Sequence, residues 1–216
     1  MNTKLLVVDL QYFPSVDYIF AISRSSYIIF DECLTFRKMS FRNRTVIAGA
    51  NGPINLTVPV LGGRDVKEKM RDIKIDNSQA WKARHLRSIV SSYNRSPFFE
   101  FFSDSLGELF EVKFERLQDW NLACMDWLVK NCGLKFEVKV ANHPAEISGS
   151  DQFEDFRDRF FPRTIPQVQS LVLPYRQVFE DKFGFIPHLS ILDFLFCNGP
   201  IAVRNLGNIP DGLGAG

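Results

Sequence analysis

The run from Leu5 to Leu10 constrains the fold more than any other stretch of this chain. It is apolar except for Asp9 and stops abruptly on Gln11-Tyr12-Phe13-Pro14. A buried-looking run that meets polar and aromatic groups and a proline predicts a central strand that delivers side chains to one end of a sheet. Ligands of open α/β sheets bind at that end. The sequence therefore predicts a strand over residues 4–10 with a site at its end.

The next twenty residues predict a second strand parallel to the first. Residues 15–24 carry apolar side chains at helical spacing, directly after Pro14, which favours a short helix there. Residues 27–30 then form a second apolar run that ends on Asp31-Glu32. A strand, a helix and a strand within so few residues predict a βαβ unit with parallel strands. Gln11 and Asp31 are therefore expected at neighbouring strand ends.

The rest of the chain continues the alternation of strands and helices. We expect strands at 54–60, 72–76 and 135–140, and helices at 79–93, 104–111, 116–132, 174–183 and 189–197. Residues 142–170 are predicted to be loop-like. This order predicts an α/β fold with a mainly parallel central sheet and flanking helices, whose opening is also that of nucleotidyltransferase-like folds. One domain over residues 1–205 and a flexible tail over 206–216 are expected.

Composition excludes several classes of protein. A net charge of +1 gives no support for a nucleic-acid partner, and no apolar stretch is long enough to span a membrane. The four cysteines lack the spacing of a zinc site or a disulfide framework, and the three histidines lack that of a metal site. The chain has no dinucleotide-binding, phosphate-loop, hydrolase-elbow or zinc-protease motif. These features predict a reduced, cytoplasmic protein without a metal, and they indicate no particular cofactor.

A second candidate cluster is the basic and aromatic run of residues 36–44. It carries Arg37, Lys38, Arg42 and Arg44 between aromatic side chains. Clustered guanidinium groups can hold phosphate or carboxylate, and neighbouring rings can stack on a base or sugar. The alternative is an edge strand whose cations face water.

Two single residues in predicted helices are further candidates. His85 shares a helix face with Trp81; a lone histidine on such a face is more often a core residue, but it could contact substrate if the helix lines the sheet end. Asp193 lies in a very apolar helix and would need a partner if buried, for which the cations of the basic run are candidates. The alternative places Asp193 and Ser190 on the exposed side of that helix.

Taken in order, these motifs resemble the WbqC-like protein family. The motifs are Gln11-Tyr12-Phe13-Pro14 with Asp17-Tyr18, Asp31-Glu32, Phe41-Arg42-Asn43-Arg44, Leu56-Thr57-Val58-Pro59-Val60, Trp81 with His85, Tyr93 with Pro97-Phe98-Phe99, and Leu189-Ser190-Ile191-Leu192-Asp193 with Asn198-Gly199-Pro200. The resemblance extends from about residue 5 to 200. The chain departs from the family pattern at Asp9-Leu10 and at His188.

The resemblance implies a bacterial protein of surface polysaccharide synthesis, in particular of the O-antigen of lipopolysaccharide, where a glycine transferase role has been suggested. The positions that match family motifs make Asp31 and His85 the catalytic candidates. The substrate-binding candidates are Gln11, Tyr12, Arg42, Asn43, Arg44, Trp81 and Asp193.

We therefore expect a transferase that moves an acyl or aminoacyl group onto a small sugar- or amino-acid-derived substrate. Asp31 or His85 would take the proton of the attacking amine, whose lone pair must be free before it attacks a carbonyl. Two alternatives remain open: an ATP-dependent ligase that binds phosphates with the basic run, and a non-catalytic small-ligand-binding or scaffold protein.

Overall fold

The computed structural model describes residues 5–62, 67–141, 143, 147, 153–161 and 174–208. Its strands are β1 (Leu5–Val8), β2 (Tyr27–Asp31), β3 (Arg44–Ile47), β4 (Ile54–Thr57), β5 (Glu137–Ala141) and β6 (Phe153–Asp155). Its helices are α1 (Val16–Ile22), α2 (Trp81–Tyr93), α3 (Phe99–Glu111), α4 (Leu117–Cys132), α6 (Glu180–Phe183), α7 (Ile191–Asn198) and α8 (Pro200–Asn205), with 3-10 turns η1 (Met70–Asp72) and η3 (Leu206–Asn208). None of these helices is both long and apolar enough to cross a membrane.

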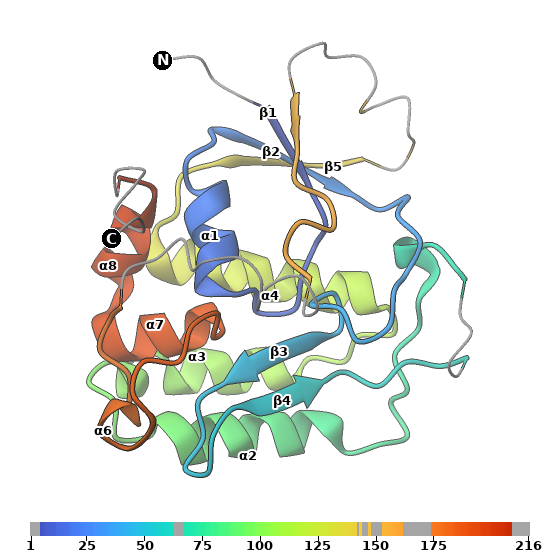
Figure 1. Ribbon diagram of the computed structural model, residues 1–216. Helices are drawn as coiled ribbons and strands as arrows, with labels where there is room; N and C mark the ends of the chain where they lie inside the picture. The colour runs from blue at the N-terminus through green and yellow to red at the C-terminus, as the bar shows by residue number, and fades with distance from the viewer. Residues whose placement is uncertain are drawn as a thin grey trace.

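A four-stranded parallel sheet in the order β5-β2-β1-β6 organises the fold. Strand β1 is central, and its register with β2 runs from Leu5 opposite Tyr27 to Val8 opposite Phe30. The predicted α/β class and the parallel βαβ opening are thus confirmed. Figure 1 shows α1 and α4 beneath this sheet, and a separate antiparallel hairpin, β3–β4, between the sheet and α2.

The two faces of the sheet bury different sets of side chains because neighbouring strand residues point to opposite sides. Leu6 and Val8 of β1 face the main core, together with Ile28 and Phe30 of β2. The alternate side chains, Val7 and Ile29 among them, pack in a smaller cluster on the other face. Because both faces are covered, β1 and β2 are apolar along nearly their whole length, as expected for a buried parallel sheet.

Helix α4 carries the apolar stripe that its sequence predicts. Leu117, Trp120, Cys124 and Leu128 are fully buried in the main core. Gly133 ends the helix in the left-handed conformation, with φ of 64°, which glycine adopts at little steric cost. The helix boundary expected from the sequence is confirmed.

Several local predictions were wrong. Residues 72–76 form no strand; η1 and single bridges, such as Lys74 to Arg116, replace it. In 174–183 only Glu180–Phe183 is helical. Within 142–170, expected as loop, Phe153–Asp155 forms β6. This strand is three residues long and mostly acidic, so it has no apolar alternation and is held by pairing with β1.

The structure also defines the start of α2 and the segment that follows α8. Helix α2 begins after Ala80, and no side chain caps its first turn. At the other end of the chain, η3 continues the ordered fold and buries Leu206. Residues 209–216 of the expected tail lie outside the described residues.

The Gln11–Pro14 turn is fixed by distant parts of the chain. Phe13 is buried with φ of 37°, a conformation that costs a non-glycine residue free energy. Its carbonyl oxygen accepts hydrogen bonds from Thr45 Oγ1 at 2.7 Å and Ser190 Oγ at 2.9 Å. After the turn, Ser15 caps α1 by accepting a hydrogen bond from the Tyr18 backbone N–H. The side chains of the turn are therefore oriented by contacts from β3 and from the start of α7.

Candidate functional site

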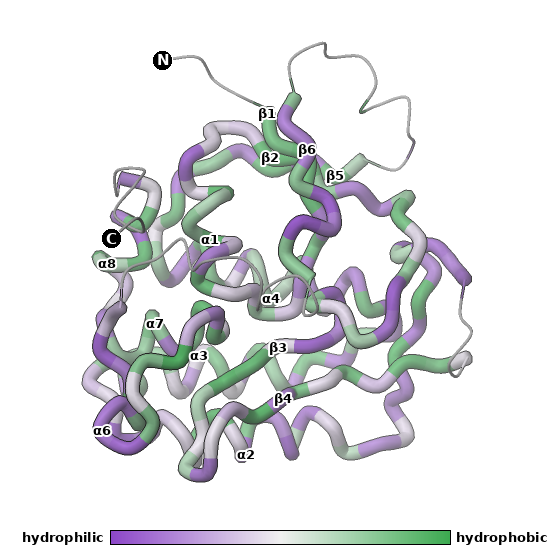
Figure 2. The backbone as a smooth tube through the Cα atoms, in the orientation of Figure 1, coloured by the Kyte–Doolittle hydropathy of each residue, from purple (hydrophilic) through white to green (hydrophobic). Residues whose placement is uncertain are grey.

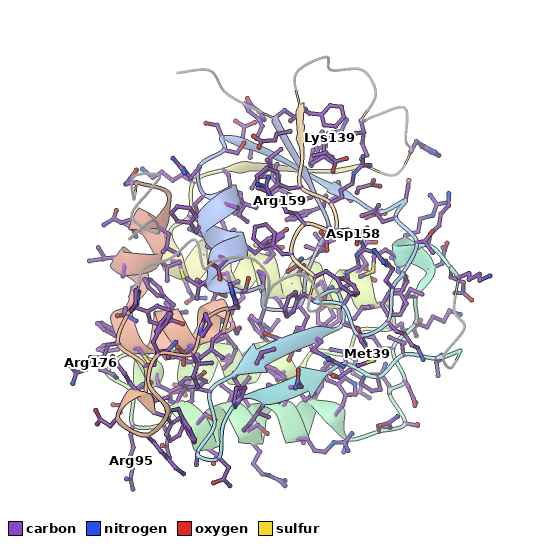
Figure 3. The ribbon with its side chains drawn as sticks, in the orientation of Figure 1. Met39, Arg95, Lys139, Asp158, Arg159 and Arg176 are labelled. Atoms are coloured by element: carbon purple, nitrogen blue, oxygen red, sulfur yellow. The ribbon has the colours of Figure 1, made fainter. Side chains whose placement is uncertain are left out.

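Charged side chains gather at the carboxyl ends of three neighbouring strands. Asp9 follows β1, Asp31 ends β2, and Arg157 and Asp158 follow β6. Since the strands are parallel, these ends meet at one edge of the sheet. Figure 2 shows β1 and β2 as mostly hydrophobic and the segment after β6 as largely hydrophilic, and Figure 3 labels Asp158 on that segment. We call the following residues the carboxyl-edge cluster: Asp9, Gln11, Asp31, Arg37, Arg42, Asp155, Arg157 and Asp158.

Arg42 is the centre of this cluster although only 1% of it is exposed. Its Nη2 donates to Asp158 Oδ1 at 2.7 Å, and its Nε lies 3.4 Å from Asp9 Oδ2. Its Nη1 donates to the Thr35 carbonyl at 2.7 Å. One guanidinium group therefore lies between two carboxylates. The alternative reading of the basic run as a solvated edge strand is wrong for Arg42.

Asp9 and Gln11 form the buried base of the cluster. Burial raises the pKa of Asp9, and this effect outweighs the opposite effect of Arg42. Gln11 Nε2 donates to Asp9 Oδ2 at 3.1 Å and to the Phe160 carbonyl at 3.3 Å. Gln11 Oε1 is buried and has no hydrogen-bond partner among the described residues. The base of the cluster thus keeps an acceptor that only a donor group can satisfy.

Asp31 is held by the segment that follows β6. Its Oδ2 accepts from Arg157 Nη1 at 2.8 Å, and its Oδ1 accepts from the Cys33 backbone N–H at 2.8 Å. Arg157 also forms a two-point ion pair with Asp155, at 2.9 and 2.6 Å. These hydrogen bonds lower the pKa of Asp155 and raise that of Arg157. Asp31 therefore lies at the predicted edge, as an ion-paired carboxylate that also caps a turn.

Asn43 and Arg44 belong to the support of the site. Asn43 Nδ2 donates to the Val58 carbonyl at 3.1 Å, which ties the basic run to the strand region after β4. Asn121 Nδ2 of α4 donates to the Arg42 carbonyl at 2.7 Å. Arg44 opens β3 and is half-buried. The predicted binding roles of Asn43 and Arg44 stay predictions. The hydrogen bonds made by Asn43 and Asn121 favour a structural role for this part of the run, which is to position Arg42.

Tyr12, Trp81 and His85 form a second, neutral group in the core. Tyr12 Oη lies 3.0 Å from His85 Nδ1, and the His85 and Trp81 rings pack edge to face at 5.2 Å. Burial lowers the pKa of His85 to about 4, although a hydrogen bond to the Thr57 backbone raises it. His85 is thus neutral near pH 7. Its catalytic role stays a prediction, and this geometry favours a structural one, because a general base works best with a pKa near the working pH.

Asp193 lies in a third group. It is fully buried on α7, and its Oδ1 accepts from Tyr93 Oη at 2.9 Å. Burial raises its pKa to about 6, outweighing the opposite effect of Tyr93, Tyr175 and Gln177. The expectation that the basic run supplies its partner is wrong, as is the alternative that Asp193 and Ser190 lie on an exposed helix face. Asp193 does not join the carboxyl-edge cluster through these contacts.

Sequence reasoning placed Gln11 and Asp31 at neighbouring strand ends, and the structure brings Arg42 to the same edge. Sequence reasoning missed Asp155, Arg157 and Asp158. They follow from β6, which was expected as loop. The sequence signal was present, since Phe153–Phe161 mixes aromatic residues with Asp and Arg. Among the described residues, no group of three or more His, Cys, Asp or Glu side chains is arranged to hold a metal ion.

The fold and the cluster define an α/β protein with a polar site at the carboxyl edge of a parallel sheet. The chain belongs to the WbqC-like protein family, whose sequence profile matches residues 11–160. It is also 24% identical over 216 positions to the uncharacterized protein Rv1507c of Mycobacterium tuberculosis (strain ATCC 25618 / H37Rv), covering 89% of this chain and 93% of that protein. No solved structure matches the chain.

Proposed function

We propose that this protein is a transferase that binds a small sugar- or amino-acid-derived substrate at the carboxyl-edge cluster. It moves an acyl or aminoacyl group onto that substrate, in the synthesis of surface polysaccharide. The observation that carries the proposal is the ion-paired set at the strand ends in which Asp9 and Arg42 are buried and Asp158 is partly exposed. Desolvating such charges costs free energy that apolar side chains would not cost, and folds keep such arrangements mostly at functional sites.

Within the cluster, solvent exposure separates binding groups from positioning groups. The Asp158 side chain is 36% exposed, whereas its partner Arg42 is buried. Asp158 therefore contacts the substrate, and Arg42 positions it. The Arg157 side chain is 27% exposed, and Asp31 positions it in the same way.

The proposed chemistry uses an accessible carboxylate that lies next to guanidinium groups fixed by ion pairs. The attacking amine or hydroxyl of the substrate forms a bond to the donor carbonyl carbon. The bond from that carbon to the leaving group breaks, and the leaving group departs with the electron pair. The proton of the attacking group passes to a carboxylate, Asp158 or the sequence candidate Asp31.

The experiment is a transfer assay followed by mass spectrometry. Activated acyl and aminoacyl donors are incubated with amino sugars and amino acids, using wild type, Asp158→Asn and Asp31→Asn. We expect product from wild type and a loss of at least about tenfold in kcat/KM for Asp158→Asn, in line with the loss of a general base. The control is Asp104→Asn, on the exposed side of α3.

Three outcomes would contradict the proposal. Undiminished product from both cluster variants would place the site elsewhere. Dependence of product on ATP and magnesium with release of AMP or ADP would favour the ligase. Binding of a substrate without turnover of any donor would favour the small-ligand-binding protein.

A further inference from the structure

The parallel sheet has two lateral edges, formed by β5 and β6, and they differ in length. In the order β5-β2-β1-β6, each edge strand has only one neighbouring strand among the described residues. β6 is three residues long and offers few backbone groups to a further strand, whereas β5 is five residues long. An edge strand of that length presents a row of N–H and C=O groups to which another chain can pair. Strand β5 is therefore the edge that can accept a further strand.

The hydrogen bonds between β5 and β2 show which backbone groups of β5 point outward. The Glu137 N–H donates to the Ser26 carbonyl at 2.9 Å, and the Ala141 carbonyl accepts from the Glu32 N–H at 3.2 Å. Since successive residues of a strand direct these groups to opposite sides, the odd-numbered residues of β5 bond to β2. The N–H and C=O groups of the even-numbered residues point away from the sheet, with Val138 in the middle of the row.

The side chains of β5 leave this edge accessible on both faces of the sheet. Val138 lies opposite Ile28, which faces the main core, so Val138 is on the face that α1 and α4 cover. Val138 is nevertheless 44% exposed, so these helices do not cover the outer side of β5. Glu137 and Lys139 lie on the opposite face and are exposed; Figure 3 labels Lys139.

The charges of β5 are complementary to those of a second β5. We propose that two copies of this chain pair through their β5 strands, antiparallel and about a two-fold axis at Val138. Val138 of one copy then lies opposite Val138 of the second copy, and the outward-pointing backbone groups of the two strands form hydrogen bonds. Each Glu137 lies opposite Lys139 of the other copy. Two pairs of opposite charge and one apolar pair result, and cross-strand pairs of both kinds stabilise an antiparallel ladder.

Backbone geometry and charge favour the same register. Outward-pointing groups must lie opposite each other, so the two-fold axis falls at an even-numbered residue, 136, 138 or 140. An axis at 136 would place Gly133, which ends α4, opposite Lys139. An axis at 140 would place Lys139 opposite the neutral Ala141. The axis at 138 pairs residues 136–140 with each other and places every charge of this stretch opposite its complement.

A lysine on an edge strand often prevents pairing with another chain. In β5, Glu137 precedes Lys139 by two residues on the same face, so a second copy in this register meets attraction at both positions. Pairing joins the two four-stranded sheets into one continuous sheet. Because the two β5 strands run in opposite directions, the carboxyl-edge clusters of the two copies lie at opposite ends of that sheet. The pairing does not depend on the proposed function.

The test measures self-association by sedimentation velocity over a range of protein concentrations. We expect wild type to form a dimer whose fraction rises with concentration. Glu137→Lys places lysines opposite each other at both positions, and Lys139→Glu does the same with glutamates. Each variant should raise the dissociation constant at least about tenfold, since two attractive cross-strand pairs become repulsive.

A mixture of the two charge variants gives the most specific result. In a pair made of one Glu137→Lys copy and one Lys139→Glu copy, opposite charges face each other again, so the mixture should dimerise although neither variant does so alone. The control Glu108→Lys makes the same charge change at an exposed position of α3 and should leave the dissociation constant unchanged.

A backbone variant tests the pairing without a change of charge. Val138→Pro removes an outward-pointing N–H and no hydrogen bond to β2, so it should weaken the dimer. Circular dichroism checks that each variant is folded. The charge variants replace exposed side chains and keep the test valid if Val138→Pro fails to fold.

Three outcomes would overturn the inference. Wild type that stays a monomer at every concentration forms no such pair. A dimer that none of the β5 variants weakens forms through another surface. If the charge variants are monomeric both alone and in the mixture, Glu137 and Lys139 do not face each other across the two-fold axis.

Discussion

The carboxyl-edge cluster and the interior between α2 and α7 both bury ionisable side chains, but the partners of these side chains differ. At the carboxyl edge, Arg42 and Arg157 lie between carboxylates, so the buried side chains have partners of opposite charge, although burial raises the pKa of Asp9. In the interior, His85 and Asp193 have tyrosine hydroxyls as partners, and burial shifts both pKa values toward the neutral form. A buried ion needs a counterion, whereas a neutral group needs only hydrogen bonds. The first region is suited to bind a polar ligand and the second to hold the core together.

The largest expected effect comes from removing a buried ion-pair partner at the carboxyl edge. Arg42→Met leaves Asp9 buried without its guanidinium partner, so the free energy of unfolding should fall by about 3–5 kcal/mol. Urea denaturation followed by circular dichroism measures it. Arg37→Met is the matched control, since Arg37 also pairs with Asp158 but is 56% exposed. It should cost less than about 1 kcal/mol. Equal losses in the two variants would show that burial of Arg42 does not matter.

The second prediction concerns the interior between α2 and α7, where the protonation of Asp193 is tested by varying the pH. The pKa of Asp193 is raised from 3.8 to about 6, so the folded state favours the protonated acid. Its stabilisation is complete below about pH 4 and is lost as the pH rises through 6. Between about pH 4 and pH 8, wild type should lose up to about 3 kcal/mol relative to Asp193→Asn, which stays neutral. The free energy of unfolding of both proteins is measured by urea denaturation at each pH. If the curves of wild type and Asp193→Asn run parallel over this pH range, the raised pKa of Asp193 is contradicted.

A smaller effect is expected at Tyr12. Tyr12→Phe removes the hydroxyl that faces His85 Nδ1 and leaves a buried nitrogen without its partner. The free energy of unfolding should fall by about 2 kcal/mol. Tyr27→Phe is the control, because Tyr27 is 46% exposed, and it should change little. A result near zero for Tyr12→Phe would mean that this pair does not stabilise the core.

The last prediction concerns the titration of His85. Since its pKa is lowered to about 4 from 6.5, its stabilisation is present above about pH 6.5 and is lost as the pH falls through 4. NMR titration of the imidazole should give a midpoint near 4 in the folded protein. A midpoint above 6 would show a histidine that is open to solvent. It would also favour the catalytic role predicted for His85.

The opening of the chain was predictable because its information is local. The apolar runs of β1 and β2 and the spacing of α1 are readable in thirty residues, so Gln11 and Asp31 were expected at one edge. Strand β6 was not predictable, since Phe153–Asp155 is a strand only through its pairing with β1, about 150 residues earlier in the chain. The partners of Asp193 were missed for the same reason. Tyr93 lies 100 residues away and carries no charge that a search for counterions would find.

The hydrogen bonds to the Phe13 carbonyl affect the order in which parts of the newly made chain can fold. It accepts hydrogen bonds from Thr45 and from Ser190, so the turn that orients Gln11 depends on a residue made late in synthesis. A nascent chain that has emerged only as far as α4 contains β1, β2 and Arg42, yet lacks the second hydroxyl that secures this turn. The turn at the carboxyl edge is therefore completed only when the segment before α7 docks. A polypeptide of that length would carry Asp9, Asp31 and Arg42 without the ion-pair partners that follow β6.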